Sequence, residues 1–328
     1  MPVSARRIDG THRVGALPGT TLVAIGNYDG VHRGHQAMVR AGARHAHAHE
    51  LTPLVLTFHP HPHEVLSGRA HHVLTVLDRK VELLCRLDPR VRVVVTPFST
   101  QLAELHPEEF VKRILVAELG AREVLVGGNF RFGRGREGDF ATLQQLGTRF
   151  GFRARQAPLV EDDKGALSST RTRVAIQQGD LPEAERVLGR PHALSGVVTP
   201  GDGRGRGLGF PTANLSEVSE VLPPDGVYAG VVDRVENDGT AVALARAVTN
   251  LGVRPTFAAG RSVEVHLLDF SGDLRGARLR LHLVERLREE RRFADGNALA
   301  AQIAEDIAQG RASLATRRPD PAARGAWY

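Results

Sequence analysis

The feature that most constrains the fold of this chain is a change of pattern near residue 189. Before it, short apolar runs alternate with stretches that have the spacing of amphipathic helices. Strands are predicted at 22–26, 52–58, 91–96 and 123–127, and helices at 31–49, 78–87, 107–119 and 139–149. Strands that alternate with helices favour a parallel sheet with both faces covered. We therefore predict an α/β domain with a doubly wound, Rossmann-like parallel sheet.

The second half has a different sequence pattern. Two further helices are predicted at 170–178 and 181–188, and Gly189-Arg190-Pro191 then interrupts the helical pattern. Short runs of β-forming residues follow at 194–199, 226–233, 241–249, 262–270 and 277–286, and a last helix is predicted at 295–310. We predict a small, mostly antiparallel β-barrel or sandwich with a closing helix. The domains are expected at 1–188 and 189–316, and a disordered tail at 317–328.

The composition is typical of a cytoplasmic protein with packed cores. The chain has 328 residues, of which 41% are hydrophobic. Its single cysteine, Cys85, excludes an internal disulfide, and neither a secretory signal nor an apolar run of membrane-spanning length is visible. The net charge of +6 comes without a concentrated basic stripe, so we expect neither a nucleic-acid nor a membrane partner. A mild positive excess suits phosphorylated small molecules.

The turn after the first predicted strand carries the clearest chemical signal. In the stretch Gly26-Asn27-Tyr28-Asp29-Gly30-Val31-His32-Arg33-Gly34-His35, two histidines stand three residues apart and share one face of the first helical turn. Backbone N–H groups and the helix dipole favour anions there, and Gly30 and Gly34 let a phosphate chain approach the backbone. Two imidazoles beside bound phosphates can donate hydrogen bonds to the charge that grows on a pentacovalent phosphorus.

This stretch resembles the H-x-G-H signature of nucleotidylyltransferases, in the form used by bacterial bifunctional riboflavin kinase/FAD synthetases. Further segments match that family in order, at 57–62, 126–133, 168–173, 209–214, 250–257, 264–270 and 287–293. The resemblance covers about residues 15–312. It implies an N-terminal FMN adenylyltransferase domain and a C-terminal riboflavin kinase barrel, which together make FMN and then FAD from riboflavin and ATP.

For FMN adenylylation, the resemblance implies that His32 and His35 are catalytic. The attacking FMN phosphate is already an anion, so the reaction needs positioning and charge neutralisation rather than a strong base. We expect Mg²⁺ and either Arg171 or Arg173 to help neutralise the phosphates of ATP, the co-substrate. The other implied residues are Gly26, Asn27, Asp29, Gly30, Ser168, Ser169 and Thr170 for ATP, and Pro60, His61, Asn129 and Phe130 for the flavin.

Riboflavin phosphorylation needs a base, because the ribityl 5′-hydroxyl must lose a proton. The resemblance implies Glu264 for this role, and on a strand its side chain lies on the face opposite to Val263 and Val265. This half of the chain has no lysine, so Mg²⁺ and backbone amides must neutralise the phosphates. The implied residues are Thr212 and Asn214 for Mg²⁺, Gly201, Gly207 and Gly209 for ATP, and Asn250 and Arg288 for the flavin.

Two alternatives compete with this interpretation. One is an adenylyltransferase for another phosphorylated vitamin with a regulatory barrel, against which the segments 209–214 and 264–270 argue. The other is a flavin sensor without turnover, against which the intact histidines and glutamate argue. The chain departs from the family pattern at Gly128, at Thr172 and in its tail. We expect His45, His47 and His49 on a solvated helix face rather than at a metal ion.

Overall fold

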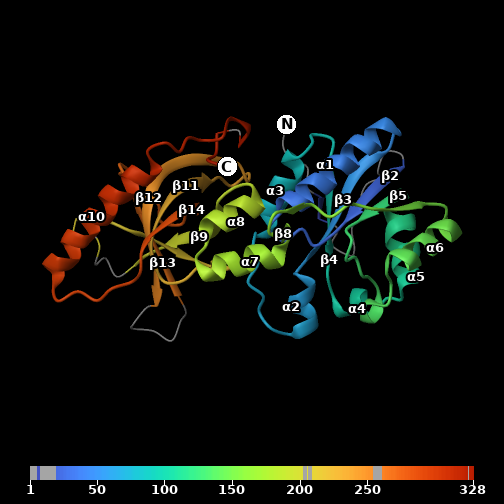
Figure 1. Cartoon of the computed structure of the whole chain (residues 1–328), viewed down its shortest axis with the longest axis horizontal. Coiled ribbons are helices and arrows are strands. Elements are labelled where there is room, and N and C mark those ends of the chain that lie inside the picture. Colours follow the sequence, from blue (N-terminus) through green and yellow to red (C-terminus); the bar gives the residue numbers. More distant parts are fainter. Residues whose placement is uncertain (1–5, 8–19, 202–204, 206–208, 254–260, 324) are drawn as a thin grey trace. The chain divides into compact units, whose positions relative to one another are not determined.

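The computed structural model describes residues 6–7, 20–201, 205, 209–253, 261–323 and 325–328. Internal contacts divide the chain into two compact units, Met1–Ser169 and Thr170–Tyr328. The first unit is built on a parallel sheet and the second on a closed antiparallel barrel (Figure 1), so the predicted fold class is confirmed. Within the described ranges, every helix is too short or too polar to span a bilayer.

The sheet of the first unit has six parallel strands in the order β1-β4-β3-β2-β5-β6. The strands are β1 (Arg6–Arg7), β2 (Thr21–Ile25), β3 (Thr52–His59), β4 (Arg92–Pro97), β5 (Ala121–Val126) and β6 (Arg153–Gln156), and a separate pair consists of β7 (Glu161–Asp162) and β8 (Gly165–Ala166). The strand order reverses between β2 and β5. Ligands of doubly wound sheets bind at the carboxyl ends of the strands at such a reversal.

Side chains that alternate along the strands build two cores, one on each face of the sheet. Leu22 and Ala24 belong to a core with α1 and α3, whereas Val23 and Ile25 belong to a core with α5, η1 and α6. These helices are α1 (Arg33–Ala48), α3 (Leu77–Arg86), α5 (Pro107–Phe110), the π-helix η1 (Val111–Glu118) and α6 (Phe140–Phe150); α2 (Pro62–Ser67), α4 (Thr100–Ala103) and η2 (Arg134–Arg136) are shorter. Both faces are therefore covered, as predicted.

The second unit contains a closed barrel with the strand order β10-β13-β12-β11-β14-β9. The strands are β9 (His192–Thr199), β10 (Ala213–Ser216), β11 (Gly226–Val235), β12 (Ala241–Val253), β13 (Arg261–Leu267) and β14 (Arg278–Arg288). Tyr228, Val265 and Leu281 belong to its interior core. Helix α7 (Ser169–Gln178) precedes α8 (Leu181–Leu188), which adds Leu181 to the same core. The two helices thus group with the barrel, earlier in the chain than the boundary predicted at 188.

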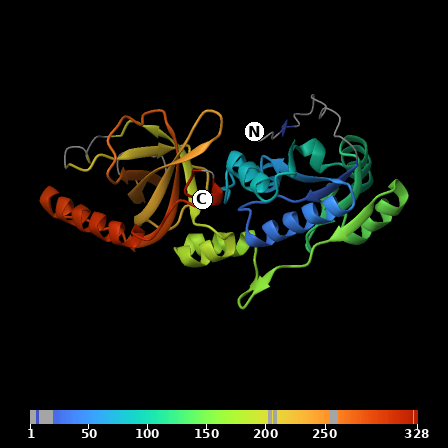
Figure 2. The ribbon, with the colours of Figure 1, turned by 90° about the horizontal axis from the view of Figure 1, so that it is seen from above.

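The closing helix α10 (Gly296–Leu314) lies beside the barrel (Figure 2), where it packs on the outer face. Its Ile307 packs against Val227, Val248 and Leu268. Gly310 allows this close approach, because a Cβ there would lie 2.6 Å from Cγ2 of Val248. The predicted closing helix is therefore present and ends a few residues later than expected.

The structure corrects the prediction that residues 317–328 are disordered. A 3₁₀ turn, η3 (Pro321–Ala323), leads to Trp327, which is only 6% exposed. The Trp327 backbone N–H donates to Oδ1 of Asp233 at 2.8 Å, and its indole N–H donates to the Val232 carbonyl at 3.1 Å. The other oxygen of Asp233 contacts Nε2 of buried His282 at 2.8 Å. A buried carboxylate and two terminal aromatic residues thus anchor a tail whose composition alone indicated disorder.

Five of the described strands escape prediction from the sequence: the two-residue strands β1, β7 and β8, and the longer strands β6 and β10. β6 reads Arg-Ala-Arg-Gln, and at the edge of the sheet it needs no apolar run. β10 has four residues, yet it closes the barrel between β9 and β13. Its formation depends on pairing with two distant strands, which a local pattern does not reveal.

The packed tail can be tested by fluorescence, because Trp327 is the only tryptophan of the chain. We expect emission at shorter wavelength than in the denatured protein and weak quenching by iodide, since the ring is buried. N-acetyltryptophanamide in the same buffer serves as the fully exposed reference. Native emission that matches the denatured spectrum would show a solvated tail.

Candidate active sites

The turn between β2 and α1 has an unusual backbone. Tyr28 and Val31 have φ angles of 51° and 42°, and Gly30 has 83°. Left-handed conformations are uncommon for residues with side chains and costly for a β-branched valine. Tyr28 and Val31 are almost fully buried, in the same core as Met38 and Val39 of α1. Core packing therefore holds the turn in a conformation that its local sequence disfavours.

This turn places His32 and His35 together at the start of α1. His32 is the N-cap residue, and its Nδ1 accepts a hydrogen bond from the His35 backbone N–H at 3.4 Å. The two rings stack with centroids 3.6 Å apart, and the Tyr28 ring meets His35 edge-on at 5.0 Å. The predicted pair of imidazoles therefore exists, at the positive end of the helix dipole.

Lys80 of α3 is a buried neighbour of this pair that the sequence did not single out. Its Nζ donates to the carbonyls of Asn27 at 3.1 Å and Phe58 at 3.4 Å, which joins the ends of β2 and β3. Burial lowers the pKa of Lys80 to about 8, although Asp29 opposes the shift. Burial, together with the charges of His32 and Lys80, also holds the pKa of His35 well below its usual range. His35 is therefore neutral at pH 7.

Asp29 connects this turn to two other segments. Its Oδ1 accepts from the Leu74 backbone N–H at 2.8 Å, and its carbonyl accepts from the Ser169 hydroxyl at 2.8 Å. Asp29 is 5% exposed, and Ser168 and Ser169 are half-buried. The residues predicted for ATP thus come together from the β2–α1 turn and from the start of α7.

The remaining turn residues predicted for ATP lie at the carboxyl end of β2. Gly26 is half-buried, and a Cβ there would lie 3.1 Å from Cε2 of Tyr28. Asn27 is exposed, while Gly30 is buried in its left-handed conformation. The close approach of the Tyr28 ring to Gly26 explains why position 26 suits glycine.

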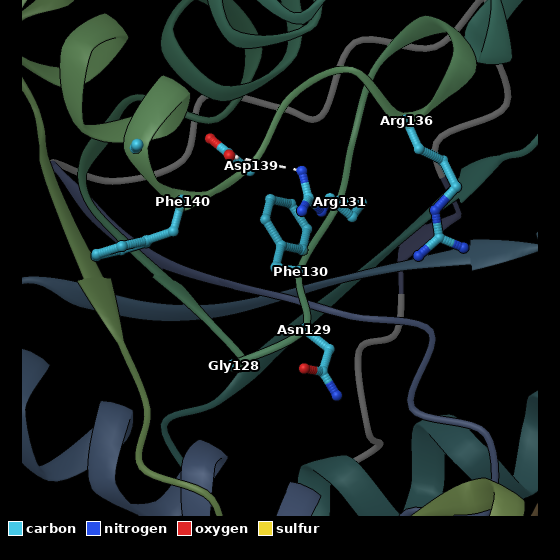
Figure 3. A pocket seen from close by; sticks show the side chains of 8 residues that line it. Gly128, Asn129, Phe130, Arg131, Arg136, Asp139 and Phe140 are labelled. Atoms are coloured by element: carbon cyan, nitrogen blue, oxygen red, sulfur yellow. Dashed lines mark hydrogen bonds and ion pairs between the residues drawn. The ribbon is translucent and has the colours of Figure 1, made fainter.

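The loop after β5 lines a cavity of about 430 Å³, shown in Figure 3. Asn129 and Phe130, both predicted to bind the flavin, line it with Gly128. Arg131 and Asp139 face each other across it, with NH1 and Oδ2 3.5 Å apart. Arg136, Phe140 and Ala141 complete the lining. The cavity combines an aromatic ring with charged groups at the end of a strand beside the order reversal, as expected of a ligand site.

Pro60 and His61 follow β3 at the same edge of the sheet. His61 is the N-cap residue of α2, and its Nδ1 accepts from the His63 backbone N–H at 3.2 Å. Its ring also stacks on His71, with centroids 4.3 Å apart. The flavin residues predicted in this segment are half-buried and lie where ligands of such sheets bind.

The residues predicted for ATP on α7 have different surroundings. Thr170 is exposed, whereas Arg171 is held by Glu183 of α8, with NH2 and Oε1 2.7 Å apart. Arg173 is half-buried, and its charge contributes, after burial, to lowering the pKa of His192 to about 4. Arg171 thus has a structural partner in α8.

The residues predicted for the kinase reaction form a row across three strands. Glu264 of β13 pairs with Asn214 of β10 on one side and with Asn250 of β12 on the other. Residues directly opposite each other in adjacent strands project from the same face. Because Val263 and Val265 belong to the interior core, the row projects outward. The predicted orientation of Glu264 is therefore found.

The predicted Mg²⁺ ligands lie at the start of β10. Thr212 is exposed and Asn214 is 7% exposed. Gly201 approaches so closely that a Cβ there would lie 2.1 Å from Nδ2 of Asn214. Gly209 has a φ of 88°, which favours glycine. Gly207, also predicted to bind ATP, lies outside the described residues.

Arg288, predicted to contact the flavin, joins β14 to the closing helix. Its Nε and NH2 donate to the two oxygens of Asp306 at 2.8 and 2.7 Å. Asp306 is 2% exposed and also accepts from Gln302 at 3.1 Å. Asp306 is a partner that the sequence analysis missed. Asp306 lies on the helix that the sequence predicted only as a closing element, and nothing in the local sequence indicated that it would pair with Arg288.

The histidines near the end of α1 are only partly solvated. His45 contacts Oε2 of buried Glu123 through Nε2 at 2.9 Å, and Glu123 also pairs with Arg155. His49 stacks on His45, whereas His47 is exposed. The expected solvated face therefore holds for His47 and His49, and His45 belongs to an ion-pair cluster at the edge of the sheet.

Comparisons with known proteins match both units. The FAD synthetase family model matches residues 16–171, and the riboflavin kinase model matches residues 188–314. A bifunctional riboflavin kinase/FMN adenylyltransferase of Escherichia coli K12 is 38% identical over 317 residues, covering 95% of this chain and 99% of the relative. One of Pseudomonas fluorescens is 40% identical over 296 residues, covering 90% and 93%.

A solved structure from Streptococcus pneumoniae, described as a macrolide-efflux protein, has the same fold. It is 30% identical, has a TM-score of 0.76, and the match covers 90% of this chain and 95% of that one. The match therefore includes both the parallel sheet and the barrel.

The parallel sheet with its paired histidines and the closed barrel with its outward glutamate define a two-module flavin-synthesising class. The chain belongs to the family of bifunctional riboflavin kinases/FMN adenylyltransferases. The predicted family and its pair of activities are thereby confirmed. Neither alternative gains support, because the riboflavin kinase model matches the barrel itself.

Gly34 offers a test of the histidine geometry. A Cβ at this position would lie 3.0 Å from Nδ1 of His32 and 3.1 Å from the Leu167 carbonyl. We expect Gly34→Ala to displace His32 and lower FAD formation from FMN by up to about 10²-fold, because misplacement of about 1 Å has such an effect. Thermal stability should stay near that of the wild type.

The control is Gly42→Ala in the same helix, where the nearest atom, 3.0 Å away, is the end of the flexible Leu125 side chain. FAD formation and stability are measured for both variants. Equal rates in the Gly34→Ala and wild-type proteins would contradict the importance of the histidine position.

Proposed function

We propose that the first unit transfers the adenylyl group of ATP to FMN, releasing pyrophosphate, and that the barrel transfers the γ-phosphate of ATP to riboflavin. For the first reaction, the observation that supports the assignment best is the stacked pair of His32 and His35 at the start of α1. For the second, it is the row of Asn214, Glu264 and Asn250.

In adenylyl transfer, the two histidines act as hydrogen-bond donors to the phosphate. His32 accepts at Nδ1, so its neutral ring carries the proton at Nε2, the nitrogen that can donate to a ligand. Nδ1 of His35 is buried and has no hydrogen-bond partner among the described residues. The neutral ring of His35 donates to the α-phosphate, where the negative charge grows in the transition state.

The phosphates also need cationic neutralisation. Either Arg173 or Arg171, which also pairs with Glu183 of α8, contacts the phosphates of ATP. Gly26, Asn27, Asp29 and Gly30, with Ser168, Ser169 and Thr170, line the nucleotide, and the cavity at Asn129 and Phe130 accepts part of the flavin together with Pro60 and His61.

In riboflavin phosphorylation, Glu264 takes the proton of the 5′-hydroxyl. Asn250, its neighbour in register, orients the flavin substrate, and the hydroxyl lies between the carboxylate and the γ-phosphate. Arg288 acts near the flavin while its pair with Asp306 fixes its side chain. Gly201, Gly207 and Gly209 are the residues proposed to bind ATP.

The residues at the start of β10 fit a magnesium ion. The hydroxyl of Thr212 and the amide oxygen of Asn214 are the hard ligands that Mg²⁺ prefers, and Gly201 leaves the approach to Asn214 without a side chain. When bound there, Mg²⁺ would supply charge neutralisation for the transferred phosphate. No lysine occurs in this half of the chain to do so instead.

The proposed reactions use only diffusible small molecules: riboflavin, FMN and ATP. Action in the cytoplasm, without a membrane or nucleic-acid partner, stays a prediction from the composition of the chain.

His35→Ala tests the adenylyltransferase assignment. We expect FAD formation from supplied FMN to fall by about 10²–10³-fold, because a preorganised donor to the transition state is lost. Riboflavin phosphorylation should not change, since Glu264 belongs to a different unit. His49→Ala, an exposed histidine next to the same helix, is the control. If both activities fell together, His35 would serve folding rather than catalysis.

Glu264→Gln tests the kinase assignment, because glutamine keeps the shape of the side chain without its basicity. Riboflavin phosphorylation should fall by about 10²–10⁴-fold, the usual contribution of a general base. FAD formation from supplied FMN should persist. The matched control is Glu236→Gln in an exposed hairpin. A near wild-type kinase rate would remove Glu264 as the base and leave His266 or solvent as candidates.

A further inference from the structure

We propose that Asp29, His61 and His71 form a binding site for a divalent transition metal ion of the zinc class. One ligand atom from each residue lies within 4.8 Å of the others. The three residues come from separate segments: the β2–α1 turn, the start of α2 and the connection from α2 to α3. The fold therefore brings together three ligands that are far apart in the sequence.

The distances suit a first-row metal ion after small side-chain rotations. A tetrahedral ion with bonds of roughly 2.0–2.2 Å to nitrogen and oxygen holds its ligand atoms about 3.3–3.6 Å apart. His61 and His71 are half-buried and their rings stack at 22° with centroids 4.3 Å apart, so both lie on one side of the site. Side-chain rotations that bring the three ligand atoms closer together by up to about 1.5 Å complete it.

Hydrogen bonds already orient two of the three ligands. Oδ1 of Asp29 accepts from the Leu74 backbone N–H at 2.8 Å, which fixes the carboxylate. Nδ1 of His61 accepts from the His63 backbone N–H at 3.2 Å, which orients the imidazole ring. Support of this kind by neighbouring groups is typical of metal ligands in proteins.

The donor set selects the kind of ion. Two imidazoles and one carboxylate suit Zn²⁺, Co²⁺ and Ni²⁺, whereas Mg²⁺ and Ca²⁺ prefer oxygen ligands. Three protein ligands leave further coordination positions open for water or phosphate. The site therefore differs in chemistry from the Mg²⁺ site proposed at Thr212 and Asn214.

The buried ammonium of Lys80 opposes cation binding, because it lies close enough to Asp29 for each charge to affect the other. We therefore expect reversible binding rather than a permanent structural ion. Such a site changes its occupancy with the concentration of free metal.

Metal binding should compete with FAD synthesis. This step rests on the proposed function, which assigns Asp29 to ATP and His61 to the flavin. An ion held by both side chains would occupy part of the place of the substrates. His71 has no role in the proposed reaction, so its removal should abolish metal inhibition and leave the basal rate unchanged.

The experiment measures Zn²⁺ affinity of the full, metal-stripped chain by competition with a chromophoric chelator, in the absence of nucleotide and flavin. We expect His71→Ala to weaken binding by at least about 10–100-fold, since even supporting residues of metal sites contribute that much. His72→Ala, an exposed neighbour, should bind like the wild type. Co²⁺ should give visible d–d absorption bands in the wild type that His71→Ala lacks.

Equal affinity of the wild-type and His71→Ala proteins would overturn the proposal, as would an equal loss in His72→Ala. Because the titration contains no substrates, it remains readable even if the chain made no FAD. A separate assay at saturating Mg²⁺, with ATP and FMN below their KM values, then measures inhibition of FAD formation by Zn²⁺. Zinc that binds through His71 without inhibiting would overturn the competition with substrates.

Discussion

The adenylyltransferase site depends on a turn that its own residues disfavour. Tyr28 and Val31 have positive φ angles, each at a cost of about 1–3 kcal/mol. The hydrophobic core that contains both side chains and the hydrogen bonds of Asp29 offset this cost. The result is a helix that begins directly after the strand, with His32 as its cap and His35 stacked on it. Strain in the turn thus serves the placement of two imidazoles at a helix terminus.

The two units position their candidate site residues by different backbone features, a helix terminus in the first unit and strand register in the second. Adenylyl transfer begins with a nucleophile that is already charged, and in the proposed mechanism two imidazoles at a helix terminus act as donors. Phosphorylation begins with a neutral hydroxyl and needs a base. The proposed base is Glu264, which strand register places between two asparagines on the outer face of the barrel.

The sequence predicted the features that depend on residues close together in the chain. The strand–turn–helix stretch at Gly26–His35 indicated the histidine pair, and alternation along β13 indicated the outward face of Glu264. What it could not predict depends on distant partners. Lys80 matters because α3 buries it against the ends of β2 and β3, and Asp306 because α10 brings it to Arg288. The packed tail likewise depends on Asp233, a buried carboxylate far away in the sequence.

The central claim is that the two chemistries are carried by separate residues in separate units. It is tested most directly by mixing the Glu264→Gln and His35→Ala proteins with riboflavin, ATP and Mg²⁺ and separating the flavins by chromatography. Each protein alone should make little FAD. The mixture should make FAD at a rate close to that of the wild type, because one variant supplies FMN and the other adenylylates it. FMN that accumulates in the mixture without conversion to FAD would contradict the account.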